Sequence, residues 1–215
     1  MARPASSLEP VELLQVNLIE WGQDKTLYRV HHERFRKNAF NPARKGNARF
    51  SPVFDRSGTV IPTLYAGNTL DCALMETVFH EVPYKAGFKP LSLSLLDRQV
   101  ASEITPKKNL LLVDLSTVAL HKLGIKRSQL IDTTKAHYPR TRRWAEAFHE
   151  QFPKAQGLRW TSRQDDRAYA VVLFGTRVRT NDLRPAANSI RLISAGEAIP
   201  QVLDLAIRLG VTLVD

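Results

Sequence analysis

The stretch that decides the fold is Leu64–Glu81, which reads LYAGNTLDCALMETVFHE. The residues Pro62–Ala66, which overlap the start of this stretch, are β-prone and are followed by Gly67, so they are predicted to form a short strand. Asn68 or Thr69 can then cap a helix, because the side chain of either residue can accept a hydrogen bond from the first helical turn. We therefore expect a strand, a tight turn and a helix over Leu70–Glu81.

Further short strands and helices flank this unit in an irregular order. The patterns predict strands at Thr26–Val30, Leu110–Leu115, Gly157–Thr161, Ala170–Phe174 and Val211–Val214, and a strand pair or one bent strand within Lys89–Ile104. They predict helices at Thr117–Leu123, Tyr138–Phe152 and Ala198–Leu209. Because no regular strand–helix–strand alternation exists, the sequence favours an α+β sheet sandwich over a doubly wound sheet.

Length and composition indicate one globular domain. The chain has 215 residues, of which 43% are hydrophobic and 24% charged, so it is not a disordered chain. We expect an N-terminal extension over residues 1–24 and a single domain over residues 25–215. Apolar runs are far shorter than the roughly 20 residues of a membrane span, the first ten residues lack an apolar signal core, and Cys72 is the single cysteine. These features predict a cytoplasmic protein without membrane contact or disulfides.

The charge is strongly basic, with 31 Lys and Arg against 21 Asp and Glu, a net charge of +10. This balance favours an anionic partner such as nucleic acid, a phosphate-bearing small molecule or an acidic protein, although it also serves solubility alone. The basic residues gather in two stretches, Arg34–Arg49 and Arg140–Arg167. Neither is a run of consecutive like charges, so both are expected on folded surfaces.

Most standard catalytic motifs are absent. The sequence has no P-loop, GxGxxG, CxxC, HExxH or GxSxG. Its six histidines have no recognisable metal spacing, and one cysteine cannot build a zinc site without distant carboxylates. We therefore expect no metal centre.

Glu76 is the first candidate for chemistry. On a helical wheel it falls at the border of an apolar arc, beside Cys72 and Phe79. A carboxylate at such a border is partly desolvated, as a catalytic group often is, but the same position also suits an ordinary boundary glutamate.

A second candidate combines Tyr28-Arg29 on the first strand with Arg49 in the polar loop of residues 31–60. A loop of this length is usually functional or disordered. Paired arginines can grip a pyrophosphate in bidentate fashion, whereas the structural alternative is a salt bridge to an acidic residue.

Ser162 is the third candidate, at the end of the strand Gly157–Thr161. No local histidine or aspartate could activate it as a nucleophile, so a hydrogen-bonding role suits it better. The structural alternative is a serine that satisfies backbone groups at the strand end.

Together these pieces resemble the RES domain, which is named for an arginine, a glutamate and a serine and is found in the toxins of Xre–RES toxin–antitoxin pairs. The resemblance rests on Tyr28-Arg29, Gly46-Asn-Ala-Arg49-Phe-Ser51, Leu64-Tyr65-Ala-Gly leading to Ala73-Leu-Met-Glu76, and Gly157-Leu-Arg-Trp-Thr-Ser162-Arg163. It extends from about Lys25 to Arg179. It departs from the family at Trp160, where many relatives have a tyrosine or a similar residue.

The resemblance implies an ADP-ribosyltransferase-like fold, a mixed sheet core with flanking helices, and action on NAD⁺ as substrate. Some family members degrade NAD⁺ by hydrolysis or phosphorolysis, and others transfer ADP-ribose to a protein. By this resemblance Arg29 and Arg49 would hold the phosphates or the nicotinamide-side ribose. Tyr65 would stack on nicotinamide, with Tyr28 also in the binding site, and Ser162 would hydrogen-bond the ribose or amide. Glu76 would stabilise the developing oxocarbenium ion.

The resemblance also implies a cognate Xre-type helix-turn-helix antitoxin that covers the site, contact with DNA only through that antitoxin, and a possible homodimer. Two other functions stay open. One is ADP-ribosyl transfer to a protein, which often uses a second acidic residue two positions before the catalytic glutamate; here that residue is Leu74. The other is a nucleic-acid binder or ribonuclease, since Phe35, Phe40 and Phe50 alternate with basic residues.

Overall fold

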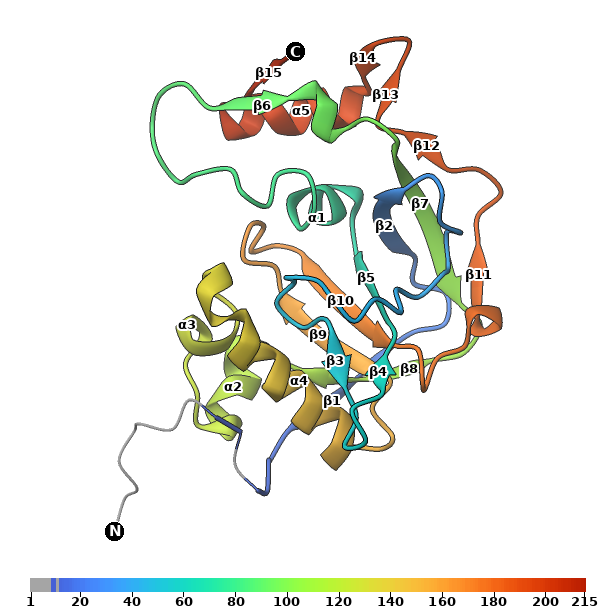
Figure 1. The fold of residues 1–215 in the computed structure, drawn as a ribbon, viewed down its shortest axis with the longest axis vertical. Coiled ribbons are helices and arrows are strands. Elements are labelled where there is room, and N and C mark those ends of the chain that lie inside the picture. Colours follow the sequence, from blue (N-terminus) through green and yellow to red (C-terminus); the bar gives the residue numbers. More distant parts are fainter. Residues whose placement is uncertain (1–8, 11) are drawn as a thin grey trace.

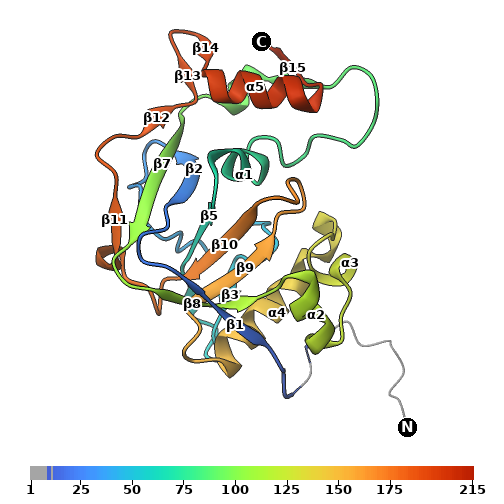
Figure 2. The same cartoon turned by 180° about the vertical axis from the view of Figure 1, so that it is seen from behind.

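The computed structural model describes residues 9–10 and 12–215. A mixed sheet of nine strands forms its centre, and helices lie toward its two ends (Figures 1 and 2). At one end are α2 (Thr117–Leu123), α3 (Arg127–Leu130) and α4 (Tyr138–Gln151). Toward the other lie α1 (Leu70–Met75) and α5 (Pro200–Leu209). The predicted α+β class is confirmed.

The strand order of the large sheet is β1-β8-β9-β10-β5-β2-β7-β11, and β12 also pairs with β7. All its pairs are antiparallel except β8 with β9. The strands are β1 (Asn17–Trp21), β2 (Leu27–His32), β5 (Thr63–Gly67), β7 (Gln99–Pro106), β8 (Leu110–Asp114), β9 (Gly157–Thr161), β10 (Tyr169–Phe174), β11 (Leu183–Pro185) and β12 (Ile190–Arg191).

Three two-stranded sheets complete the fold. They pair β3 (Val53–Phe54) with β4 (Val60–Ile61), β13 (Ile193–Ser194) with β14 (Glu197–Ala198), and β6 (Pro90–Ser92) with β15 (Thr212–Val214). Single 3₁₀ turns occupy Leu93–Leu95, Lys135–His137 and Thr180–Asp182. The strand β3 and the first residue of β4 lie in the segment 31–60, which the sequence analysis interprets as a loop.

The large sheet divides between β5 and β2. These strands meet at one residue pair, Tyr28 with Gly67, whereas β2 pairs with β7 along its whole length. Apolar side chains fill the space on each side of the division. One core cluster includes Trp144, Phe148 and Trp160 of α4 and β9, and another joins α1 and α5 to the β2–β7 half.

The predicted helix over Leu70–Glu81 is too long, because α1 ends at Met75. Its start is as expected: Thr69 is the N-cap, and its hydroxyl accepts a hydrogen bond from the amide of Cys72 at 3.0 Å. At the other end the hydroxyl of Thr77 donates to the carbonyl of Ala73 at 2.6 Å, which replaces helical bonding by a turn. Glu76 therefore ends the helix instead of lying within it.

Two further differences have local causes. Leu93–Leu95 is a 3₁₀ turn and not part of a strand, because the hydroxyl of Ser92 accepts from the amide of Ser94. The sequence pattern missed β1, which pairs with β8 from Asn17 to Trp21 at the edge of the sheet. The helix α2 is as predicted and ends at Gly124, which has a positive φ of 69°.

Gly157 lies where β9 and β10 approach closely. A Cβ at this position would be 2.2 Å from the carbonyl oxygen of Val172, so only glycine fits. This approach fixes the start of the strand that leads to Ser162.

Candidate active site

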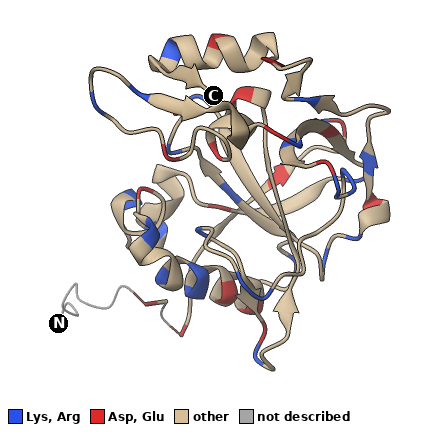
Figure 3. Ribbon diagram, turned by 45° about the horizontal axis from the view of Figure 1, so that its top comes forward, with Lys and Arg blue, Asp and Glu red and all other residues tan. Residues whose placement is uncertain are grey.

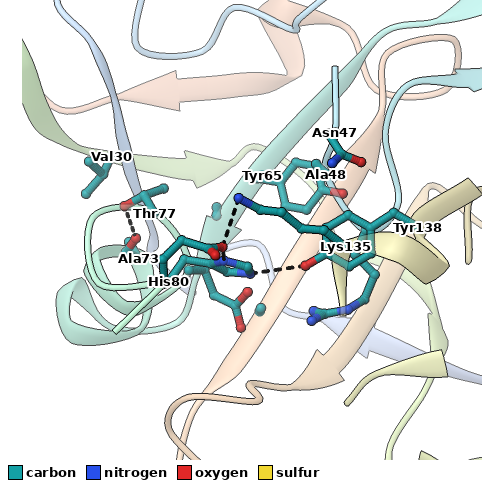
Figure 4. Close-up of a pocket in the computed structure, with 14 residues that line it drawn as sticks. Val30, Asn47, Ala48, Tyr65, Ala73, Thr77, His80, Lys135 and Tyr138 are labelled. Carbon is teal, nitrogen blue, oxygen red and sulfur yellow. Dashed lines mark hydrogen bonds and ion pairs between the residues drawn. The ribbon is translucent and has the colours of Figure 1, made fainter. Parts of the chain in front are cut away.

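A pocket of about 400 Å³ opens where β5 and β2 diverge. Because Glu76 lies in its wall, we call it the Glu76 pocket (Figure 4). Small apolar residues from three strands and α1 form part of the lining, namely Val30, Ala66, Ala73 and Ala170. The polar lining comes from Asn47, Arg49, Tyr65, Glu76, Thr77, His80, Glu81, Lys135 and Tyr138. An apolar pocket with a few convergent polar groups is the usual form of a small-molecule site.

Ser162 holds the carboxylate of Glu76. The serine hydroxyl donates to Glu76 Oε1 at 2.7 Å, and its oxygen accepts from the amides of Gln164 at 3.1 Å and Asp165 at 3.2 Å. The two amides fix the hydroxyl, so its proton points at the carboxylate. Ser162 thus accepts from backbone groups at the strand end and also contacts Glu76, a contact that the sequence analysis did not predict; its hydrogen bond to a ligand stays a prediction.

Arg49 is the second charged group of the pocket. The residue is only 4% exposed, and its Nε and Nη2 are buried without a hydrogen-bond partner among the described residues. Its guanidinium lies over the ring of Tyr138, 5.5 Å from the centroid. A buried guanidinium with unsatisfied donors is costly, and an anionic ligand would satisfy it.

Tyr65 links the strand β5 to the loop that carries Arg49. Its hydroxyl accepts a hydrogen bond from the amide of Phe50 at 2.8 Å. Its ring meets that of Trp160 edge to face at 6.1 Å. Burial raises the pKa of the Tyr65 hydroxyl above its ordinary value, so the group stays neutral and serves as an anchor.

Arg29 and Tyr28 lie outside the lining of the Glu76 pocket. The guanidinium of Arg29 donates to the carbonyls of Lys37 at 2.9 Å and Ala39 at 2.6 Å, and burial lowers its pKa to about 10. Tyr28 packs against the cluster of α1 and α5. The structure thus brings together Glu76, Ser162, Arg49 and Tyr65, and it places Arg29 in support of the loop.

The rim of the pocket contains charged residues that the sequence analysis did not single out. His80 Nδ1 is 2.6 Å and Lys135 Nζ is 3.1 Å from Glu81 Oε1, while His80 Nε2 is 3.3 Å from the hydroxyl of Tyr138 (Figure 4). His80 and Glu81 belong to the stretch that decides the fold, so their place near Glu76 could have been suspected. Lys135 and Tyr138 come from a distant segment and carry no local signal.

Charges of both signs are intermixed over the molecule (Figure 3). The two basic stretches meet near the pocket, where Arg142 Nη1 is 3.5 Å from Asn47 Oδ1.

Within the described residues, no three His, Cys, Asp or Glu side chains are arranged to hold a metal ion. No helix in this part of the chain is long and apolar enough to cross a membrane.

Comparison with known proteins places this geometry in a family. A family model described as "RES domain" matches residues 26–193. The chain belongs to the RES-domain family. A comparison with curated proteins finds no match. Among solved structures, this RES domain resembles a chain in the crystal structure of the M. tuberculosis MbcT–MbcA toxin–antitoxin complex, with a TM-score of 0.60 and 17% identity over 80% of this chain and 85% of that chain. The expected ADP-ribosyltransferase-like fold is confirmed.

Proposed function

We propose that this RES domain is the toxin of a toxin–antitoxin pair and that it cleaves the nicotinamide–ribose bond of NAD⁺. The observation that supports this most is the Glu76 pocket itself. It combines a carboxylate oriented by a buried hydroxyl with a buried arginine whose Nε and Nη2 have no hydrogen-bond partner among the described residues. One group suits a developing cation and the other suits a phosphate, and NAD⁺ presents both.

In the reaction the bond between the ribose C1 and the nicotinamide nitrogen breaks, and its electron pair leaves with nicotinamide. Positive charge then develops on the ribose. Glu76 would stabilise this charge, because a carboxylate that interacts more strongly with the transition state than with the substrate lowers the barrier. A water then adds to C1 and releases a proton, which yields ADP-ribose; in phosphorolysis, inorganic phosphate adds instead.

Degradation of NAD⁺ is favoured over transfer of ADP-ribose to a protein. Transferases of the wider class often carry a second acidic residue two positions before the glutamate. Here Leu74 occupies that position and is fully buried against α5. It offers no group that could activate an acceptor side chain.

The nucleic-acid alternative loses its support in the structure. It required three aromatic rings among the basic residues of the 31–60 segment as a stacking surface. Phe50 is fully buried beside Trp160, and Phe40 packs against the core, which leaves Phe35 exposed.

We also propose that the protein acts in the cytoplasm and is held inactive by an Xre-type helix-turn-helix antitoxin that covers the pocket. The matched structure is that of a toxin–antitoxin complex, which supports such a partner. In this proposal DNA is reached through the antitoxin alone, and the toxin forms a homodimer within the complex. If the toxin elutes in size-exclusion chromatography at the volume of a monomer at micromolar concentration, the proposed dimer is contradicted.

Nicotinamide release from NAD⁺, measured with and without phosphate, tests the activity. We expect release by the wild type and a loss of about 10²–10⁴-fold in rate in Glu76→Gln, the scale for one positioned catalytic group. A dependence on phosphate would indicate phosphorolysis. If the wild type releases no nicotinamide, or if Glu76→Gln matches it, the proposal is wrong.

A further inference from the structure

A second cavity adjoins the Glu76 pocket. It has a volume of about 520 Å³, and Tyr84 lies in its wall, so we call it the Tyr84 cavity. The two hollows share four lining residues, His80, Glu81, Lys135 and Tyr138. They are therefore two chambers on either side of one polar wall.

Hydrogen bonds between distant segments shape the Tyr84 cavity. The hydroxyl of Tyr84 donates to the carbonyl of Arg163 at 3.2 Å, and Gln164 Nε2 donates to the carbonyl of His80 at 2.9 Å. The guanidinium of Arg163 donates to the carbonyl of Thr133 at 3.0 Å. The segment after β9, which begins with the Ser162 that holds Glu76, thus also forms part of the second chamber.

Tyr84 is an exposed ring on a fixed anchor. The residue is 73% exposed, yet its hydroxyl is held at the β9–β10 connection. An aromatic ring whose end is fixed loses little conformational entropy when a flat ligand stacks on it. Such rings are the platforms on which proteins stack nucleic-acid bases.

The wall between the chambers presents a positive charge. Lys135 lines both the Glu76 pocket and the Tyr84 cavity, and about half of its side chain is exposed. The ammonium of Lys135 forms an ion pair with Glu81, which also contacts His80. If the ammonium binds another anion instead, Glu81 therefore keeps its contact with His80. A diphosphate that crosses from one chamber to the other would pass this ammonium.

We propose that the Tyr84 cavity receives the adenosine half of the dinucleotide, with the adenine ring stacked on Tyr84 and the pyrophosphate beside Lys135. This inference rests on the proposed function, which places the nicotinamide riboside at Glu76. The two nucleosides of a dinucleotide are separated by its pyrophosphate, as the two chambers are separated by the wall that contains Lys135. The Tyr84 cavity is then the site that selects a dinucleotide over a mononucleotide.

Two substrates that differ only in the adenylate half test the assignment. Nicotinamide release is followed from NAD⁺ and from nicotinamide mononucleotide, with wild type, Tyr84→Ala, Tyr84→Phe and Phe88→Ala. Phe88 is a matched control, because it is 67% exposed, lies with Tyr84 in the segment between α1 and β6, and does not line the cavity. We expect Tyr84→Ala to lower kcat/KM for NAD⁺ at least about fivefold, the low end for loss of one base–aromatic stack, with no change for the mononucleotide. Phe88→Ala should stay within twofold of wild type for NAD⁺. Tyr84→Phe keeps the ring but loses the hydroxyl that anchors it, so its loss should be smaller than that of Tyr84→Ala.

An equal loss on both substrates, or no loss on NAD⁺, would overturn the assignment. Titration of the same proteins with ADP separates its failure from that of the proposed function. If the wild type releases no nicotinamide from either substrate, the proposed activity fails, but ADP binding that weakens at least about fivefold in Tyr84→Ala still supports the adenosine site. ADP binding that is absent, or equal in wild type and Tyr84→Ala, overturns it.

Discussion

Replacement of Ser162 by alanine separates the two tasks of this hydroxyl. In the protein the group donates to Glu76 Oε1 at 2.7 Å and accepts from two backbone amides. Ser162→Ala removes all three bonds and adds no bulk. We expect a lower rate because Glu76 is no longer oriented, and a lower stability because buried amides lose their acceptor.

The size of each effect follows from the groups involved. A hydrogen bond to a charged group contributes about 1.5–3 kcal/mol, so the loss of orientation should lower kcat about 10- to 150-fold. Amides left without an acceptor cost a further 1–3 kcal/mol or so in the free energy of unfolding. KM should change less than kcat, since the serine acts through Glu76.

Two measurements on each variant give the answer: nicotinamide release at saturating NAD⁺, and unfolding in urea. Ser116→Ala is the matched control, because the hydroxyl of Ser116 also donates to a carboxylate, Asp114 Oδ2 at 3.0 Å, and caps α2 outside the pocket. It should lose stability and keep its rate. If Ser162→Ala loses stability and its kcat stays within twofold of the control, Ser162 serves the strand end alone and the reasoning is refuted.

Three further changes probe the site and the fold. Arg49→Met should weaken ADP-ribose binding at least about tenfold in calorimetric titration, because it removes the guanidinium whose Nε and Nη2 have no hydrogen-bond partner among the described residues. It should change the free energy of unfolding by less than about 1 kcal/mol, and intact binding would contradict its role. Burial and the charge of Arg29 lower the pKa of His31 from 6.5 to about 4 in the folded protein. As the pH falls, the unfolded state therefore binds the proton before the folded state does. The free energy of unfolding should fall by about 3 kcal/mol for this group between pH 6.5 and pH 4. Urea unfolding of His31→Gln should therefore depend less on pH in that window, and an unchanged dependence would refute this. Thr69→Ala removes the cap of α1 and should cost about 1 kcal/mol in urea unfolding, whereas no loss would show that the cap is dispensable.

Local patterns predicted much of the fold. The strand β9 and the helix α2 have the predicted bounds, because strand propensity and the Ser116 and Gly124 ends are properties of neighbouring residues. The helix α1 was predicted too long, since the apolar spacing continues to Phe79 although the chain turns at Glu76. Phe79 lies beyond the end of α1 and is fully buried, so the apolar spacing that includes it indicated a buried side chain and not a continued helix.

The residues of the candidate site were likewise predicted only in part. Residue types and their order identified Glu76, Arg49, Tyr65 and Ser162 as candidates. The same reasoning grouped Arg29 with them, but side chains alternate along a strand, and Val30 of β2 lines the pocket while Arg29 turns to the loop. Lys135 and Tyr138 were not identified, because nothing near them in the sequence places them at the pocket.

The sequence by itself determined where strands and helices begin and which side chains could perform the chemistry, since capping, periodicity and residue type act over a few positions. The tertiary structure alone decided that Glu76 meets Ser162, which is 86 positions away, and that a buried arginine faces the same pocket. This contact depends on the order β9-β10-β5 in the sheet, which places the end of β9 near α1. Pairing of strands far apart in the chain is set by the burial of whole faces, and no local spacing encodes it.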